Sequence, residues 1–372
     1  MNNVRAIEYI DLAQQWKIER EELLPIIDKV LSEGMWIGGN AISHFENLIC
    51  KYTGAKHCVA LNSGTDALVC ALAASGVKAG DEVITPPNSF IASTSAISHL
   101  NAIPVFVDVL DDQSINPELV CKAITNKTKA IMPVHLTGRM SNMAQLKSLA
   151  EKFGIKLIED AAQSIGSKYQ NIQAGRFGDV GCFSTHPLKN LNACGDGGFI
   201  ISDNSKIANE IKKMRNHGLV DRETVESFGY VSRMDTIQAA ILSYRIKNLD
   251  KVINKRRSNA MIYKQELDKN YVYFPEDDAM RYSTFHTFVI QVDNRDSLKN
   301  YLENNGIKTA IHYPIPIHLQ PAARYLKFEK GDFIKTEEQA TRILSLPVNQ
   351  FLSPDDVKFI ANKINGFFKS SK

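Results

Sequence analysis

Residues 180–202 read VGCFSTHPLKNLNACGDGGFIIS, two apolar runs of strand-like composition separated by a polar loop that carries Lys189. Ser, His and Pro precede this lysine and a glycine-rich turn follows it. A buried lysine is costly unless its amine is neutral or hydrogen-bonded, and desolvation frees the amine lone pair for a Schiff base with a carbonyl compound. Because most lysines are exposed, the stretch alone also fits a surface lysine in a loop after a strand.

The same apolar runs recur through the first two hundred residues. Helical stretches lie between many of them, at 65–75, 115–124 and 142–153. Continuous apolar strands separated by helices predict an α/β fold with a mostly parallel sheet covered on both faces, whose ligands collect at the carboxyl ends of the strands. The expected strands are 57–61, 82–86, 103–109, 130–136, 155–160, 180–184 and 198–202.

The sequence pattern at both ends of the chain differs from that of this central part. Amphipathic patterns predict N-terminal helices at 7–33 and 41–53, each followed by a glycine, and one or two long helices at 235–267. After about residue 270, strands near 284–292 and 308–312 alternate with helices near 296–304, 336–343 and 354–367. We therefore expect a large domain over 1–250 and a smaller C-terminal α+β domain over 251–372.

Composition narrows the class of protein. A net charge of +3, from 44 basic and 41 acidic residues, is too balanced to indicate nucleic-acid or membrane binding. No apolar run approaches membrane-spanning length and the N-terminus lacks a signal-peptide layout, so a cytoplasmic protein is expected. The six cysteines form no CxxC pair and are expected to be buried and reduced, and the nine histidines show no metal-binding spacing.

The stretch LNSGTDAL (61–68) places a Ser-Gly-Thr turn between a strand and a helix. Free N–H groups at a helix N-terminus bind phosphate, and the Ser63 and Thr65 hydroxyls would add donors. It lacks the GK[ST] ending of a Walker motif. Taken alone, a helix capped by Ser or Thr is the simpler interpretation of this stretch.

The stretch PPNSFIAST (86–94) puts Phe90 in a loop at a strand end. An aromatic ring there could stack on a planar cofactor. Taken alone, a core phenylalanine is the simpler interpretation.

In IEDAAQS (158–164), an apolar strand ends in Glu159 and Asp160, with Gln163 shortly after. A carboxylate at the end of a buried strand needs a partner, and a protonated pyridine nitrogen would be one. Gln163 could donate to the hydroxyl of such a ring. The alternative is an aspartate that caps the following helix.

Ser184 supplies a further phosphate donor near Lys189, and His186 is structural, orients the lysine or faces the substrate. Four features thus follow one another at strand ends of one α/β domain. They are donors for a phosphate, an aromatic ring that could stack on a cofactor, a carboxylate for a pyridine nitrogen and a lysine that could form a Schiff base. Together they predict a pyridoxal phosphate site.

With these motifs in view, the sequence resembles the DegT/DnrJ/EryC1/StrS sugar aminotransferases, which are fold-type I pyridoxal phosphate enzymes. The resemblance spans residues 7–365 and rests on stretches that include MWIGGNAISHFE, KHCVALNSGTDAL, LIEDAAQSIGSKY, HPLKNLNACGDGG and AIHYPIPIHLQPA. It implies that Lys189 is the covalent anchor, that Asp160 pairs with the ring nitrogen and that Gln163 approaches the ring oxygen. Phe90 would lie over the ring, and Gly64, Thr65 and Ser184 would hold the phosphate.

The resemblance also implies a homodimer with shared active sites, in which loop 35–40 or 229–233 reaches the partner. Trp36, His186 and Arg233 are candidate substrate residues, as are His312, Tyr313 and His318 of the C-terminal segment. Relatives usually carry Asn two residues before the Arg of the SRM-like segment, where it reaches the neighbouring subunit's cofactor phosphate. Here that residue is Val231, and His186-Pro187 before the lysine is a second departure.

The resemblance implies transfer of an amino group, from L-glutamate, to a keto-sugar linked to a nucleotide, in polysaccharide biosynthesis. A smaller phosphorylated ketone is an alternative substrate. A dehydratase on the same scaffold would carry His in place of Lys189, and a silent regulatory protein would not need Lys189, Asp160 and Gln163 together. A nicotinamide-dependent dehydrogenase is disfavoured because no GxGxxG follows the first strand. The identity of the keto substrate lies beyond what the sequence decides.

Overall fold

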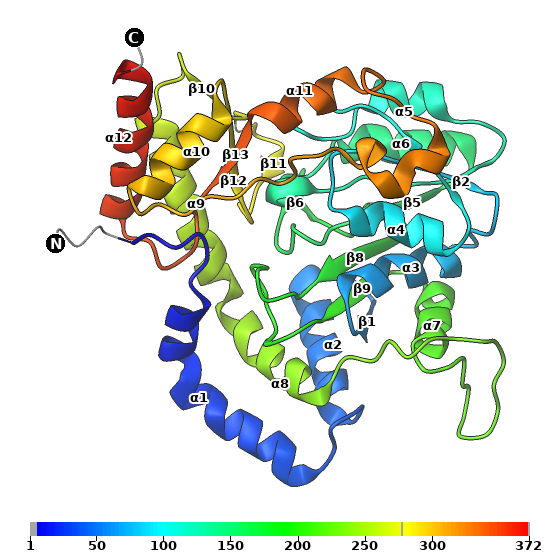
Figure 1. Cartoon of the computed structure of the whole chain (residues 1–372). Helices are drawn as coiled ribbons and strands as arrows, with labels where there is room; N and C mark the ends of the chain where they lie inside the picture. The colour runs from blue at the N-terminus through cyan, green and yellow to red at the C-terminus, as the bar shows by residue number, and fades with distance from the viewer. Residues whose placement is uncertain (1–5, 277, 371–372) are drawn as a thin grey trace.

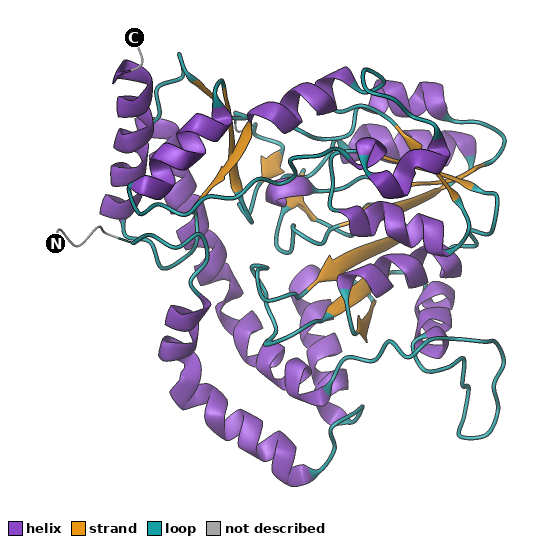
Figure 2. Ribbon diagram, in the orientation of Figure 1, coloured by secondary structure: helices purple, strands orange, loops and turns teal. Residues whose placement is uncertain are grey.

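A central seven-stranded sheet organises the computed structural model, which describes residues 6–276 and 278–370 (Figures 1 and 2). The strand order is β1-β9-β8-β5-β4-β2-β3. The strands are β1 (His57–Leu61), β2 (Glu82–Thr85), β3 (Ile103–Phe106), β4 (Thr128–Ile131), β5 (Lys156–Asp160), β8 (Val180–Ser184) and β9 (Gly198–Ser202).

Most neighbouring strands of this sheet run parallel. The β3–β2, β2–β4, β4–β5 and β5–β8 pairs are parallel, whereas β9 is antiparallel to both β8 and β1. Because β9 reverses direction between them, β1 and β8 point the same way. The loops that leave the carboxyl ends of β1, β2, β4, β5 and β8 therefore meet at one edge of the sheet, as the α/β prediction requires.

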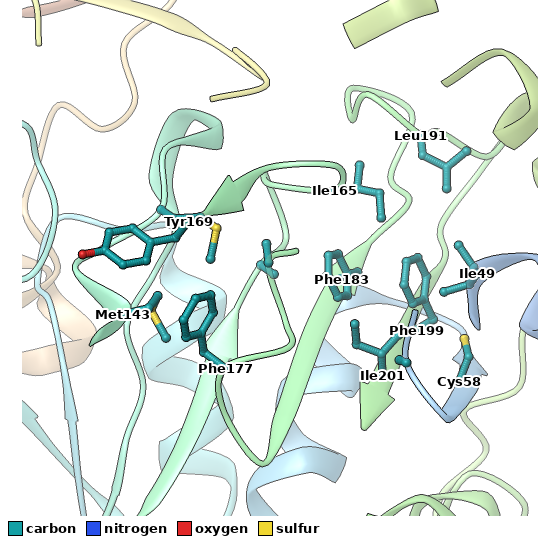
Figure 3. Packing of buried hydrophobic residues seen from close by; sticks show 14 of the residues in the cluster. Ile49, Cys58, Met143, Ile165, Tyr169, Phe177, Phe183, Leu191, Phe199 and Ile201 are labelled. Carbon is teal, nitrogen blue, oxygen red and sulfur yellow. The ribbon is translucent and has the colours of Figure 1, made fainter. Parts of the chain in front are cut away.

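Two core clusters cover the two faces of the sheet, because side chains alternate along each strand. In β8, Cys182 belongs to one cluster and Phe183 to the other. Figure 3 shows part of the cluster around Phe183, whose ring stacks on that of Phe199 with a centroid distance of 4.8 Å. The mostly parallel sheet with both faces buried is confirmed.

Helices form the outer layers over these two clusters. α3 (Gly64–Ala74), α4 (Ile91–His99) and α7 (Ser205–Met214) pack on the face that includes Cys182. The opposite face is covered by α2 (Asn40–Thr53), α5 (Pro117–Ala123), α6 (Met143–Phe153) and α8 (Thr236–Arg245).

A smaller antiparallel sheet follows, with its own core and flanking helices. The long helix α9 (Leu249–Glu266) joins the two parts, since Ile253 packs in the core of the large sheet and Tyr263 in that of the small one. Ile7 also packs in the small core. A domain boundary near residue 250 stays a prediction. The other elements of the small part are β10 (Val272–Tyr273), β12 (Phe288–Val292), α10 (Arg295–Asn304), α11 (Ile334–Arg342), β13 (Ile343–Leu346) and α12 (Pro354–Ser370).

Several expected boundaries were wrong. The first helix, α1 (Leu12–Glu33), begins only after Asp11, whose side chain caps it by accepting from the Gln14 N–H at 2.8 Å. The strand expected at 130–136 ends at Ile131, before Pro133, because proline has no N–H for the ladder. Helix α4 was not anticipated.

The small domain also departs from the expectation. The strand expected at 308–312 is only an isolated bridge between Ala310 and Ser345, and the prolines at 314 and 316 stop it from extending. The third strand is instead β13, which was not expected; only its first residue, Ile343, falls in the helix expected near 336–343.

The cysteines divide by exposure. Cys58, Cys70 and Cys182 are buried as expected, whereas Cys121 and Cys194 are exposed, which corrects the expectation for those two. In the described ranges, His, Cys, Asp and Glu side chains do not gather as a metal site, and no helix has the length and apolar character needed to cross a membrane.

Candidate active site

A cavity of about 440 Å³ opens at the carboxyl edge of the large sheet, where the small domain meets it. Its walls come from the loops after β1, β2, β4, β5 and β8, from Tyr9, and from the segments around residues 286 and 312. The sequence-predicted residues that line it are Ser63, Gly64, Thr65, Phe90, Asp160, Gln163, Ser184, His186, Lys189, His312 and Tyr313.

The turn between β1 and α3 forms one end of the cavity. Ser63 is the N-cap of α3, and its Oγ accepts the Asp66 N–H at 3.0 Å. A Cβ added to Gly64 would lie 2.7 Å from the Ser184 Cβ, so only glycine allows the helix N-terminus to approach β8 this closely. The remaining N–H groups of the first turn, with the Thr65 and Ser184 hydroxyls, form a cradle suited to a phosphate.

Asp160 is held at the carboxyl end of β5. The residue is 4% exposed. Its Oδ2 accepts the Ser93 hydroxyl at 2.7 Å and its Oδ1 accepts the Ala162 N–H at 3.2 Å. Burial raises the pKa of the carboxyl, while Ser93, Ala162 and the nearby Lys189 oppose that rise. Each oxygen keeps a lone pair for a cationic partner in the cavity.

Gln163 is oriented by its neighbours. Its Oε1 accepts the Thr137 N–H at 2.7 Å, and its Nε2 lies 3.5 Å from the Tyr313 hydroxyl. The amide therefore presents its N–H side to the cavity and to Tyr313. A donor in this place suits an anionic ring oxygen.

Glu159, next to Asp160, fixes the backbone beneath the site. Its carboxylate is fully buried and accepts three backbone N–H groups, from Gly175, Phe177 and Gly178, at 2.7–2.8 Å. The fourth partner is His135 Nε2 at 2.9 Å. Opposite strand faces carry the two acids, so Glu159 braces the sheet while Asp160 faces the cavity.

Lys189 extends from a tight turn after β8. Its backbone N–H donates to the His186 carbonyl at 2.8 Å. The backbone N–H of Thr185 donates to the Gly197 carbonyl, and the Thr185 carbonyl accepts the Ala193 N–H. Burial lowers the pKa of the Lys189 amine to about 8, with the charge of Asp160 acting in the opposite direction. A fraction of the amine is thus neutral near pH 7, as a nucleophile requires.

His186 lies on the same turn. Its Nδ1 accepts the Leu188 N–H at 3.3 Å, so the imidazole stabilises the loop that carries the lysine. Burial, followed by the charge of Lys189, lowers its pKa. The side chain also lines the cavity, which leaves a substrate contact open.

Phe90 is not a core residue. Its side chain is 54% exposed and its ring lies 5.6 Å from that of Tyr313, with both rings at the cavity. His312 follows on the same segment, where Nδ1 lies 2.8 Å from the Ser345 Oγ. Burial and the charge of Lys189 lower the His312 pKa to about 4, so its imidazole is neutral.

Three predicted substrate residues do not line this cavity. Trp36 lies on an exposed loop, and Arg233 lines a separate cavity of about 310 Å³ with Lys212 and Arg215. His318 is 2% exposed and contacts Glu337 at 3.1 Å, which accounts for it as a structural histidine.

Other residues that line the cavity were not predicted from the sequence. Ser93 lies in PPNSFIAST and Asp196 in HPLKNLNACGDGG, but no local pattern distinguishes either residue from its neighbours. His286 and Tyr9 come from distant parts of the chain and reach the cavity through the small domain. Only the tertiary arrangement brings them to it.

The donor set fits pyridoxal phosphate. The cradle at Gly64 suits its phosphate, the buried carboxylate of Asp160 suits its ring nitrogen, and the amine of Lys189 suits its aldehyde. The exposed ring of Phe90 lines the cavity and offers a face on which an aromatic ring could stack.

Comparison with known proteins agrees with this reading. The chain is 38% identical to a UDP-N-acetyl-3-dehydro-alpha-D-glucosamine 3-aminotransferase of Acidithiobacillus ferrooxidans, covering 98% of both chains. It is 37% identical to a pleiotropic regulatory protein of Geobacillus stearothermophilus, over 98% of this chain and 99% of that protein. It is 34% identical to the 3-oxo-glucose-6-phosphate:glutamate aminotransferase of Bacillus subtilis, over 89% of this chain and 76% of that enzyme.

Solved structures share the fold over nearly the whole chain. DesV of S. venezuelae, crystallised with a ketimine intermediate, has a TM-score of 0.95 at 34% identity and covers 97% of this chain and 98% of its own. NtdA of Bacillus subtilis, crystallised with its cofactor PMP, has a TM-score of 0.87 at 32% identity, covering 94% and 82%. The family model of the DegT/DnrJ/EryC1/StrS aminotransferases matches residues 17–365. The chain therefore belongs to this family of sugar aminotransferases and is a pyridoxal phosphate-dependent enzyme.

Proposed function

We propose that the enzyme transfers an amino group from L-glutamate to a keto-sugar carried on a nucleotide, in the biosynthesis of a surface polysaccharide or glycan. The observation that carries the proposal is the Lys189 amine, which lines the cavity, has a pKa lowered to about 8 and is attracted by Asp160. Several relatives are named as UDP- or dTDP-sugar aminotransferases, and one name includes glutamate.

The residues that would hold the cofactor follow from the cavity. Gly64, Thr65 and Ser184, with the Ser63 turn, would bind its phosphate. Asp160 would pair with the ring nitrogen, Gln163 would donate to the ring oxygen and Phe90 would cover the ring. The cofactor supplies an aldehyde for the amino group and a ring that accepts electrons.

Lys189 does the acid–base work in this proposal. Its neutral amine would take the proton from the α-carbon of the amino donor and pass it to the cofactor carbon that receives the amino group. It would run the same two transfers in reverse when the keto substrate is aminated. Asp160 keeps its negative charge next to the ring nitrogen throughout. His312 and Tyr313 are neutral donors and acceptors for sugar hydroxyl groups. Kinetics should be ping-pong, because the two substrates use one site in turn.

We also propose that two copies share their active sites. Large apolar side chains are exposed on the loop before α2 and on the loop between α7 and α8, which protrudes at the lower right of Figure 1. Trp36 is 61% exposed, Val231 is 56% exposed and Phe228 is fully exposed. A second copy would cover these side chains. A sedimentation measurement that finds a monomer at micromolar concentration would contradict this arrangement.

A smaller phosphorylated ketone is the second candidate substrate. The name of the Bacillus subtilis relative specifies 3-oxo-glucose-6-phosphate, and Val231 stands where the family resemblance implies an asparagine. Cytoplasmic location and the glycan pathway remain predictions.

The test uses purified protein reconstituted with pyridoxal phosphate. L-glutamate should bleach the visible band of the bound cofactor and yield 2-oxoglutarate. A panel of UDP- and dTDP-linked keto-sugars, together with 3-oxo-glucose-6-phosphate, should then restore the band with one substrate class. Lys189→Ala should abolish both steps. No response to L-glutamate would reject the donor, and restoration by the hexose phosphate alone would favour the second candidate.

A further inference from the structure

We propose that His286, backed by the buried cation of Arg256, forms a subsite for the α-carboxylate of the amino donor. The inference rests on the proposed function, because it specifies how the same cavity recognises an amino acid. His286 lines the cavity two residues before the start of β12, and Arg256 lies in the middle of α9.

Arg256 is a buried charge whose described hydrogen bonds are made to backbone carbonyls. Its side chain belongs to a residue 3% exposed, and its Nη1 donates to the carbonyls of His286 at 3.0 Å and Phe285 at 3.4 Å. Its Nε is buried without a hydrogen-bond partner. Burial lowers its pKa to about 10, so it stays a cation at neutral pH. Such a charge is costly unless an anion compensates it.

The segment that Arg256 contacts continues into the cavity, since Arg256 binds the His286 carbonyl and Thr287 is the next residue. His286 and Thr287 both line it and are 7% and 3% exposed. Nδ1 of His286 and Oγ1 of Thr287 are buried and lack partners among the described residues. Unpaired buried polar atoms are uncommon, and when they converge on a cavity they indicate a polar ligand.

Arg256 is the cation nearest to this wall that has no role assigned so far. The charged side chains that line the cavity among the described residues are those of Lys189, Asp160 and Asp196, and each of the first two has a proposed role towards the cofactor. The cofactor phosphate has its own cradle at the α3 N-terminus. The positive potential of Arg256 is therefore left for another anion, and the donors at His286 and Thr287 match the two oxygens of a carboxylate.

Proximity identifies which carboxylate is bound. Lys189 and His286 line the same cavity, and the charge of Lys189 contributes to the lowered pKa of His286. Lys189 must reach the α-carbon of the donor, and the α-carboxylate is attached to that carbon. The neutral imidazole of His286 can then donate an N–H to it.

The experiment compares two donors that differ only in the α-carboxylate, L-glutamate and 4-aminobutanoate. The donor half-reaction is followed through the absorbance of the bound cofactor in single turnovers. Arg256→Met should raise the half-saturating L-glutamate concentration by about tenfold or more, because a partner of a buried charge pair is lost. The value for 4-aminobutanoate and the affinity for pyridoxal phosphate should change by less than about threefold.

Arg257→Met is the matched control. Arg257 is the next residue of α9, and its Nη1 donates to the Ser283 carbonyl at 2.6 Å in the same segment. It should leave the ratio between the two donors unchanged, and Arg256→Lys, which keeps the charge, should restore most of the L-glutamate affinity. His286→Ala should weaken L-glutamate selectively and serves as the test if Arg256→Met does not fold.

The outcomes separate the two hypotheses. If the wild-type enzyme responds to neither donor, the proposed function fails. If it responds to L-glutamate and the Arg256 and His286 variants weaken both donors equally, or neither, the subsite is wrong and Arg256 only supports the loop.

Discussion

Ser93 Oγ lies 2.7 Å from Asp160 Oδ2, and Ser89 Oγ lies 3.1 Å from Ser93 Oγ on the other side. An ionised carboxylate can only accept, so Ser93 must donate to Asp160 and can accept from Ser89. All three residues are buried. Ser93 lies in the first turn of α4, which begins directly after Phe90. One segment therefore both covers the proposed ring position and orients the Asp160 carboxylate.

Ser93→Ala should therefore weaken pyridoxal phosphate binding by roughly tenfold, since a hydrogen bond to a charged group contributes about 1.5–3 kcal/mol. The loss should be absent for 1-deaza pyridoxal phosphate, in which carbon replaces the ring nitrogen. Fluorescence titration of cofactor-free protein measures both affinities.

Ser93→Thr, which keeps the hydroxyl, and Asp160→Asn are the controls for this prediction. The threonine variant should bind like the wild type, and the asparagine variant should lose the preference for the nitrogen-containing ring. An equal loss for both cofactors in Ser93→Ala would show that Ser93 supports only the fold. An unaltered preference in Asp160→Asn would reject the role of Asp160 itself.

Lys189 should destabilise the cofactor-free protein. Its folded-state pKa of about 8 lies below the unfolded value of about 10.4. The charged amine therefore disfavours the folded state below pH 8, by at most roughly 3 kcal/mol, and this penalty fades as the pH rises towards 10.4.

Lys189→Met should accordingly unfold at higher urea concentration than the wild type at pH 7, with the difference shrinking between pH 8 and 10. Urea titrations at pH 7, 9 and 10 measure the effect on cofactor-free protein. Lys251→Met, at an exposed position of α9, should show no such trend. A constant gap at all three pH values would mean that side-chain packing, not charge, is responsible.

The fold and the residues proposed to hold the cofactor followed from local patterns, whereas the residues proposed for the substrate side did not. Apolar runs that end in polar turns marked Thr65, Asp160 and Lys189, because each motif sits at a strand end of one sheet. His286 and Arg256 are joined to them only by the packing of the small domain, and no local pattern records that contact. His318 shows the converse, since its motif suggested a substrate residue, whereas the structure buries it against Glu337 and away from the cavity.

The sequence placed Glu159 at the end of a strand but did not predict that its carboxylate would accept hydrogen bonds from the neighbouring backbone. Four donors surround its carboxylate, and Gln would turn an NH2 group towards at least one of them. Glu159→Gln should therefore lower the free energy of unfolding by roughly 3 kcal/mol. Chemical denaturation measures this, with Glu118→Gln at an exposed position as the control. A loss no greater than that of the control would mean that the backbone donors find other acceptors.

Val231 offers the most direct test of the shared active site. It is exposed on the loop between α7 and α8, and an amide there would reach the neighbouring subunit's cofactor phosphate if the proposed dimer forms. Val231→Asn should then bind pyridoxal phosphate roughly tenfold more tightly, because it adds a hydrogen bond to a charged group. Val225→Asn changes an equally exposed valine, 52% against 56%, on the same loop and should have no effect. The gain should vanish when the protein is diluted below the concentration at which it dimerises. Equal behaviour of the two variants would show that this loop does not reach a partner's cofactor.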